Sequence, residues 1–215
     1  MNRISIAIVA TVFVVCAGLT ASRGGAQDNA QQPTGTIKGQ VTASGVRDVE
    51  NVLVYVEKAP GEYPPSKQPA QMDQQKLTFI PRVLPIVKGT TVNFLNSDPV
   101  LHNVFWSKSD DGSYPARNLG TWGKGTSKDF VFDKEGSVVL LCNVHPEMES
   151  HIVVVQNPFF ALVGKDGAYE IKGVPPGQYS VKAWYPNPKK LKSKTAKATV
   201  TAGQAAPLDF SLSRK

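Results

Sequence analysis

One short segment of the chain contains three side chains that bind soft metal ions. Cys142, His145 and Met148 lie within seven residues, at the end of an apolar stretch, and His102 precedes them by forty residues. A thiolate, two imidazoles and a thioether suit copper cycling between Cu(I) and Cu(II), with three strong ligands and one weak axial sulfur. The spacing therefore predicts one mononuclear copper site per chain, made by His102, Cys142, His145 and Met148.

Other metal centres fit these side chains less well. Zinc could use the thiolate and both imidazoles, but it rarely takes a thioether as its fourth ligand. A dinuclear copper centre needs a second cysteine in the loop, and residues 143–148 contain none. Glu147 and Glu149 offer hard oxygen donors, which compete poorly with Met148 for Cu(I), so we expect both to be solvated.

Each candidate ligand also has an ordinary structural interpretation. A lone cysteine on an apolar strand is more often a packed small hydrophobic residue than a ligand. A lone histidine at the end of a strand is more often a hydrogen-bonded surface residue. The combination of three ligand types in one loop with a separate His102 favours a metal site. His151, the third histidine of the chain, is interpreted as a strand residue rather than as an accessory ligand.

The histidine count limits the catalysis that one chain could perform. The chain contains three histidines, and the predicted copper site uses two of them. Copper oxidases and nitrite reductases need a second centre with several more histidines, and the one remaining histidine cannot build such a copper cluster. The sequence therefore predicts that this chain is not an enzyme by itself.

Strand patterns dominate the chain, and helical periodicity is scarce. Apolar and polar residues alternate in 37–41 and again in 52–56. Residues 59–70 contain four prolines and are expected to be a linker or a long loop. Prolines in 79–87 predict an irregular edge strand. Further strands are expected at 91–95, 130–132, 137–142, 152–155, 159–163, 168–171, 179–184, 199–201 and 208–212. Residues 107–129 are expected to form a long loop, and 130–132 a hairpin with 137–142. The predicted fold class is all-β, built from sandwiches.

The ligand pattern resembles that of the cupredoxins, the blue copper electron carriers. The resemblance rests on His102-Asn103-Val104 followed by Cys-x-x-His-x-x-Met, with amicyanin-like loop spacing, and on Phe79-x-Pro81, Val87-x-Gly89-x-x-Val92-x-Phe94-x-Asn96. It covers residues 69–156 and implies a Greek-key β-sandwich with a type 1 copper ion. By resemblance, His102, Cys142 and His145 bind equatorially and Met148 binds axially. Asn103 then braces the ligand loop, and His145 is the more exposed ligand and the port for electrons.

The flanking segments resemble a second kind of sandwich, the carboxypeptidase regulatory-like or transthyretin-like domain. The resemblance rests on 35–41 and 52–56 before the cupredoxin-like part, and on 164–171 and 174–179 after it. Bacterial proteins described as methylamine-utilisation-like combine these two patterns. We therefore expect a discontinuous sandwich of residues 35–58 and 159–213, with the cupredoxin-like domain, 69–156, inserted into it.

The N-terminus has the form of a secretory signal peptide. Arg3 precedes an apolar run, 4–21, and small residues follow it, so cleavage is expected after Ala26. A permanent membrane anchor is disfavoured because the run contains polar residues, and a lipoprotein site at Cys16 is disfavoured because apolar residues continue after it. The mature chain, expected in the periplasm or another extracytoplasmic place, would keep Cys142 as its lone cysteine. A lone thiol outside the cytoplasm is either buried and inert, paired with another chain, or bound to a metal.

Charge and composition limit the partners. The formal net charge is +7, and loss of Arg3 and Arg23 with the signal would leave +5, which favours acidic partners or anionic surfaces. An exported chain without a recognition motif is not expected to bind nucleic acid. The lysine-rich segment 189–197 is either a solvated turn or a docking patch for an acidic redox partner. The predicted function is extracytoplasmic one-electron transfer. The alternatives are a copper-binding or adhesion module without electron transfer, and a structural sandwich with a vestigial site.

Overall fold

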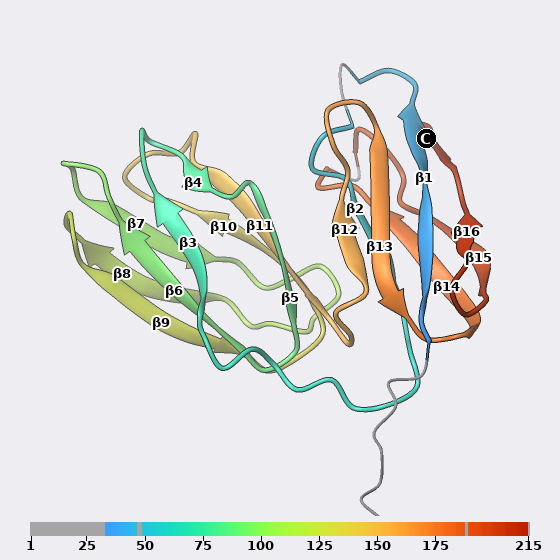
Figure 1. Cartoon of the computed structure of the whole chain (residues 1–215). Helices are drawn as coiled ribbons and strands as arrows, with labels where there is room; N and C mark the ends of the chain where they lie inside the picture. Colours follow the sequence, from blue (N-terminus) through green and yellow to red (C-terminus); the bar gives the residue numbers. More distant parts are fainter. Residues whose placement is uncertain (1–32, 47–48, 188, 215) are drawn as a thin grey trace, which may run out of the picture. The chain divides into compact units, whose positions relative to one another are not determined.

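Alternating apolar residues form strands along the whole described part of the chain, which comprises residues 33–46, 49–187 and 189–214 of the computed structural model. Every regular element in these residues is a β-strand (Figure 1), so the predicted all-β class is confirmed. Among them, no helix has the length and apolar character needed to cross a membrane. The predicted signal peptide, 1–26, lies outside the described residues.

Seventeen strands follow one another along the described residues. They are β1 (Gly35–Ala43), β2 (Leu53–Val56), β3 (Ala70–Gln74), β4 (Phe79–Ile80), β5 (Val83–Val87), β6 (Thr90–Asn96), β7 (His102–Trp106), β8 (Arg117–Trp122), β9 (Ser127–Phe132), β10 (Gly136–Leu141), β11 (Glu149–Val155), β12 (Phe160–Leu162), β13 (Ala168–Val174), β14 (Gly177–Trp184), β15 (Lys194–Val200), β16 (Ala205–Pro207) and β17 (Phe210–Leu212). The described residues all lie within one compact unit.

The middle of the chain, residues 70–155, forms a sandwich that we call the site lobe. One sheet has the strand order β4-β3-β6-β9, and the other has the order β5-β11-β10-β7-β8. Side chains alternate along β6, where Val92 and Phe94 are fully buried. Together with Trp106 and Phe132 they form the core between the two sheets, and burial of each such side chain contributes about 1.5–3 kcal/mol.

Two expectations for the site lobe are wrong. Residues 130–132 and 137–142 do not form a hairpin, because β9 pairs with β6 in one sheet and β10 pairs with β11 and β7 in the other. Phe132 and Leu140 are both fully buried in the core of the site lobe, so the turn between them carries the chain from one sheet to the other. The expected loop 107–129 contains β8, an edge strand whose side chains are largely exposed and therefore give no apolar period.

The expected irregular edge strand at 79–87 is present in two pieces. β4 lies at the edge of one sheet of the site lobe, and β5 lies at the edge of the other. Edge positions tolerate proline, which has no N–H to donate to a neighbouring strand. Pro85 accordingly lies within β5, which pairs on one side with β11. The sequence did not indicate β3, which pairs in parallel with β6.

Strands from both ends of the described chain share a second sandwich, which we call the split lobe (35–58 and 159–212). β1 pairs with β13, β16 and β17, and the facing sheet has the order β12-β2-β14-β15. Its core is a separate cluster that includes Ile37, Val54, Ile171 and Phe210. The boundaries of the two domains and the families that they resemble remain predictions.

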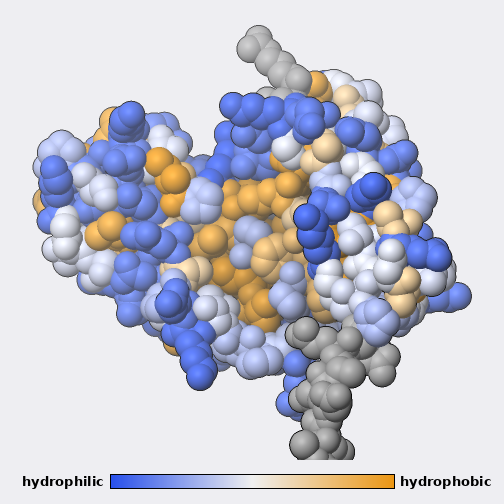
Figure 2. All heavy atoms as spheres, viewed as in Figure 1, coloured by the Kyte–Doolittle hydropathy of each residue, from blue (hydrophilic) through white to orange (hydrophobic). Residues whose placement is uncertain are grey.

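A small apolar cluster contains side chains from both sandwiches. Leu53 from β2 packs with Val83, Val153 and Val155 from β5 and β11, and Trp184 lies against them. Figure 2 shows hydrophilic residues spread over much of the viewed surface.

Candidate metal centre

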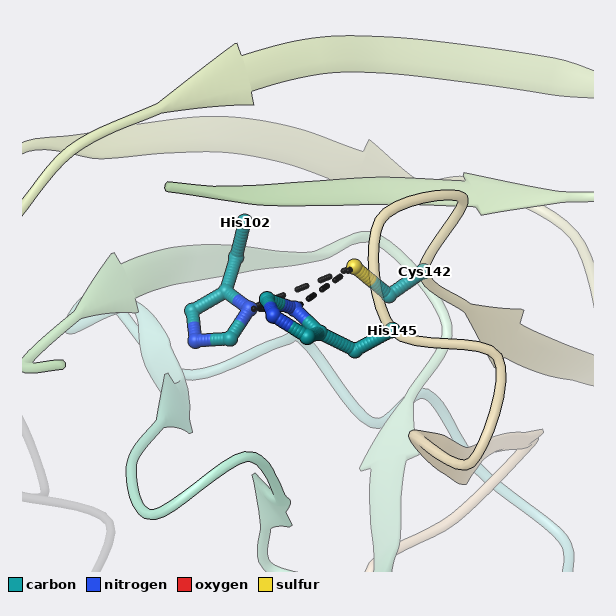
Figure 3. A group of neighbouring side chains, drawn as sticks. All are labelled: His102, Cys142 and His145. Atoms are coloured by element: carbon teal, nitrogen blue, oxygen red, sulfur yellow. Dashed lines mark hydrogen bonds between the residues drawn. The ribbon is translucent and has the colours of Figure 1, made fainter. Parts of the chain in front are cut away.

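Two neighbouring strands bring the candidate ligands together. His102 is the first residue of β7, and Cys142 directly follows β10. These strands are adjacent in one sheet, where Leu141 pairs with Phe105. His145 lies in the connection from β10 to β11, and Figure 3 shows the three side chains pointing toward one another. Residues forty positions apart in sequence thus share one end of the site lobe.

The ligand atoms of these three residues form a small triangle. The Cys142 Sγ atom lies 4.0 Å from the Nδ1 atom of His102 and 4.0 Å from the Nδ1 atom of His145. The two Nδ1 atoms are 3.0 Å apart. A point equally distant from all three atoms lies about 2.2 Å from each, which is within the range of metal–nitrogen and metal–sulfur bonds to transition metals. The donor set therefore fits one metal ion without rearrangement of the backbone.

The two histidines differ in their exposure. His102 is fully buried and Cys142 is 3% exposed, whereas His145 is partly exposed. Water therefore reaches the cluster on the His145 side. This difference agrees with the expectation that His145 is the more exposed of the two histidines.

Asn103 links the ligand loop to the sheet. Its backbone N–H points at the Cys142 Sγ atom at 3.4 Å, and its Oδ1 atom lies 3.4 Å from the backbone nitrogen of Asn143. Its Nδ2 atom donates to Asn118 and to the carbonyl oxygen of Gly120, both at 2.8 Å. Because Asn103 is buried, these bonds restrict the loop that carries Cys142.

Asp98 is the main residue near the site that the sequence did not indicate as functional. Its Oδ2 atom lies 2.8 Å from the Nε2 atom of His102. The backbone N–H groups of Lys76 and Leu77 also donate to this carboxylate, at 2.6 and 2.8 Å. Burial alone would raise the pKa of Asp98, but the hydrogen bonds from Leu77, His102 and Lys76 hold it below its ordinary value.

The position of Asp98 has a sequence signal that could have been used. It precedes His102 by four residues, within the turn segment Asn96-Ser97-Asp98-Pro99. Histidine ligands of metals usually donate their second ring N–H to a carboxylate or a carbonyl. A search for such an acceptor close to each predicted histidine ligand would have selected this aspartate.

Met148 lies close to the cluster in the chain and is 1% exposed. Its backbone N–H donates to the carbonyl oxygen of His145 at 3.0 Å, which closes the turn between them. The side chain packs in the same core as Cys142. These contacts place Met148 inside the lobe, and axial ligation by its sulfur remains a prediction.

His151 is outside the ligand cluster. It lies on β11, is 3% exposed, and packs edge-on against Trp184 with ring centroids 5.6 Å apart. Its Nε2 atom is 3.3 Å from a carboxylate oxygen of Glu149, whose side chain is half exposed. Desolvation lowers the pKa of His151, and this effect outweighs the opposing charge of Glu149.

The solved structures described next match slightly less than half of this chain. No protein-family model matches the chain, and no curated protein sequence matches it. A copper-containing nitrite reductase (NirK) from Thermus scotoductus SA-01 has 26% sequence identity, a TM-score of 0.39, and an alignment covering 46% of this chain and 25% of that one. The matched part is thus a quarter of the length of the reductase.

Two structures of amicyanin variants also match. A methionine-to-alanine variant with Cu(I) has 20% identity and a TM-score of 0.37, and the alignment covers 47% of this chain and 97% of that one. A reduced tryptophan-to-tyrosine variant has 21% identity and a TM-score of 0.38 over the same shares of both chains. From its own structure, the chain is an all-β protein with a candidate metal centre of one thiolate and two imidazoles.

Proposed function

We propose that this chain is a cupredoxin-like protein that binds one copper ion at His102, Cys142, His145 and Met148 and carries single electrons. The observation that carries the proposal is the triangle of one thiolate sulfur and two Nδ1 atoms at 4.0, 4.0 and 3.0 Å. Two imidazoles and a thiolate in a trigonal arrangement, with a weak axial sulfur, are the ligand set of blue copper sites. Bound copper would supply one reversible electron at this place.

Two features of the site suit electron transfer. The ligands come from adjacent strands, and Asn103 and Asp98 hold the flanking segments by hydrogen bonds. Ligands that are held in place move little when the charge of the ion changes, so little energy is spent on rearrangement. This argument supports a carrier, because each transfer would start and end with nearly the same geometry.

The surface beside His145 supports a docking role in the proposal. Leu101, directly before His102, is 59% exposed, and Val144, directly before His145, is 49% exposed. Exposed apolar side chains around a partly exposed ligand favour brief contact with a second protein. We propose that electrons enter and leave at the exposed edge of His145.

The proposal does not include catalysis by this chain alone. The chain has three histidines, and two of them belong to the cluster. His151, the third, lies on β11 against Trp184 and offers no neighbouring histidine for a second copper centre. We therefore propose a carrier that exchanges electrons with a separate redox protein, for which the net positive charge of the chain, +5 after loss of Arg3 and Arg23, favours an acidic surface.

Export and the second sandwich complete the proposal. The N-terminal pattern of residues 1–26 supports export to the periplasm or another extracytoplasmic place. The pairing of β1 with β13 supports a carboxypeptidase regulatory-like sandwich divided by the copper domain. In this arrangement the split lobe would serve as a spacer or docking module beside the redox centre.

Replacement of the thiolate tests the copper site directly. Cys142→Ser should remove the intense visible band of the copper-loaded protein, because that band arises from charge transfer between the thiolate and Cu(II). The absorption spectrum of both proteins after addition of one equivalent of Cu(II) measures this. An unchanged band in the variant, or no band in the wild type, would contradict the proposal.

A second measurement separates an electron carrier from a protein that only holds copper. A carrier should show a reversible voltammogram and should keep its copper through repeated reduction and oxidation. A copper-holding module should release the ion when it is reduced to Cu(I). Copper content after ten cycles, measured by atomic absorption, distinguishes the two functions.

A further inference from the structure

We propose that Asp98 is a positioning residue of the copper site, which fixes the ring of His102 and lowers the reduction potential of the bound ion. The inference rests on the proposed copper function. It concerns a residue that is not itself a ligand. Its basis is the set of contacts that join Asp98 to His102 and to the turn after β3.

The hydrogen bond to His102 selects one tautomer of the ring. The Nε2 atom lies 2.8 Å from the Asp98 Oδ2 atom, and the Nδ1 atom faces Cys142 and His145. A carboxylate can only accept a hydrogen bond, so the ring proton is held on Nε2. The lone pair on Nδ1 is then directed at the centre of the triangle, as a ligand requires.

The carboxylate is itself held from a second side. Lys76 and Leu77 both have positive φ angles, 54° and 56°, and their N–H groups both point at Asp98. The left-handed conformation is unfavourable for side chains of this kind. The Asp98 carboxylate offsets this cost by accepting both N–H groups, and the turn in return prevents Asp98 from rotating away from His102.

The surroundings make this carboxylate electrostatically effective. Asp98 is 6% exposed and His102 is fully buried, so water screens the pair weakly. A negative charge one imidazole ring away from the ion stabilises Cu(II) more than Cu(I). It also increases the basicity of the histidine ligand through the shared proton. Both effects lower the reduction potential.

A role in folding alone is the competing explanation, since Asp98 also closes the turn at 76–77. The two roles differ in what they predict for the copper ion. A purely structural residue would change the stability of the lobe and leave the potential of the folded, copper-loaded protein as it was. A positioning residue would change the potential and the copper affinity as well.

Asp98→Asn is the first test. Three donors point at the carboxylate, and an amide has only one oxygen to accept them. The variant should keep its visible copper band, show a reduction potential shifted to more positive values, and bind Cu(II) about 10–100-fold more weakly. Voltammetry and competition with a chelator of known affinity measure the two changes. A potential equal to that of the wild type would overturn the proposal.

Asp73→Asn is the matched control, because it makes the same charge change on a nearby carboxylate that does not contact His102. Asp73 accepts from the Ser97 hydroxyl and from the backbone of Gln74. The reduction potential of the Asp73→Asn variant should equal that of the wild type. An equal shift in both variants would overturn the proposal, since net charge would then explain it. Asp98→Glu, which keeps the charge, should move the potential back toward the wild-type value.

Metal-free protein separates this inference from the copper function. In the ¹⁵N spectrum of the wild-type apoprotein, recorded where the signals show a neutral imidazole, the single ring proton of His102 should lie on Nε2 and not on Nδ1. That result would support the positioning role even if copper gave no visible band. A proton on Nδ1 would overturn it, and this measurement needs no variant to fold.

Discussion

Single residues restrict the candidate ligands more tightly than the ligand spacing in sequence implies. Asn103 and Asp98 are both buried, and each connects a ligand-bearing segment to another part of the site lobe. Removing one partner of a buried hydrogen bond costs about 1–3 kcal/mol. The ring of His102 and the loop that begins after Cys142 are therefore held before any ion binds.

Met148 provides a test of the axial position. Met148→Leu keeps the volume and the apolar character, so the free energy of unfolding should fall by less than about 1.5 kcal/mol. Loss of a weak sulfur donor should destabilise Cu(II) relative to Cu(I), and the reduction potential should rise while the visible band remains. Voltammetry of the folded protein measures the change.

Met72→Leu is the control for that prediction. Met72 is fully buried on β3 and contacts the Ser150 hydroxyl, so it tests the general effect of losing a buried thioether. The reduction potential of the Met72→Leu variant should equal that of the wild type. If Met148→Leu also leaves the potential unchanged, the sulfur of Met148 is not an axial ligand.

The sequence indicated the residues of the ligand cluster but not their supports. Cys142 and His145 were recognisable because a thiol, an imidazole and a thioether in one short loop form a ligand set that suits copper. Asp98 was not recognisable as a functional residue, because an aspartate before a proline is typical of ordinary turns. Its role follows only from the fold of 74–78, which brings two strained backbone N–H groups to the same carboxylate.

At the level of elements, the pairing of β7 with β10 determines which residues meet at the candidate metal centre. The strands themselves were largely predictable, because side chains of β6 and β14 alternate between buried and less buried positions. Which strands pair with one another could not be predicted from the sequence. β9 and β10 are neighbours in sequence and lie in different sheets, and alternation alone cannot distinguish that arrangement from a hairpin.

β11 carries a group that should make stability depend on pH. Burial lowers the pKa of His151 below 6.5, and the nearby charge of Arg82 acts in the same direction while that of Glu149 opposes it. The unfolded chain therefore takes up the proton first as the pH falls. The contribution of His151 to stability should be complete above about pH 6.5 and should be lost as the pH falls toward its folded-state pKa.

His151→Phe should remove this part of the pH dependence. The aromatic ring can still pack against Trp184, and it has no titrating group. Denaturant unfolding of both proteins in the same metal state between about pH 7.5 and 5.5 measures the difference. Parallel stability curves for the two proteins would show that His151 does not titrate differently in the folded and unfolded states.

β1 offers a test of how the two ends of the chain form one sandwich. A Cβ atom at Gly39 would lie 2.0 Å from the carbonyl oxygen of Leu208, a backbone atom that cannot move freely. Gly39→Ala should therefore separate β1 from the segment before β17 and lower the free energy of unfolding by about 1–3 kcal/mol or more. Urea unfolding followed by fluorescence measures this loss.

Gly123→Ala is the matched control for β1. A Cβ atom there would meet only the Leu101 side chain at 3.4 Å, an ordinary contact. Its stability should stay within about 0.5 kcal/mol of the wild type. If Gly39→Ala behaves like Gly123→Ala, the close approach between β1 and Leu208 is absent in solution.

For the whole molecule, charge should control how fast electrons are exchanged with a negatively charged reagent. The net charge is +7 for the whole sequence and +5 without residues 1–26, and Lys192, Lys194 and Lys197 are exposed in and before β15. Oxidation of the Cu(I) protein by ferricyanide should therefore slow as ionic strength rises, because salt screens attraction beyond about 10 Å at 0.1 M. Stopped-flow absorbance at the visible copper band measures the rate.

Two double variants with the same change in net charge separate the effect of where the lysines lie from the effect of how many there are. Lys192→Gln with Lys194→Gln removes two charges from the lysine-rich segment, and Lys38→Gln with Lys165→Gln removes two exposed charges elsewhere on the split lobe. If the segment is a docking patch, the first double variant should lose more of the rate at low salt, and the two should converge at high salt. Equal losses at every salt concentration would mean that only the net charge of the molecule attracts the reagent, and the lysine-rich segment would then be a solvated turn.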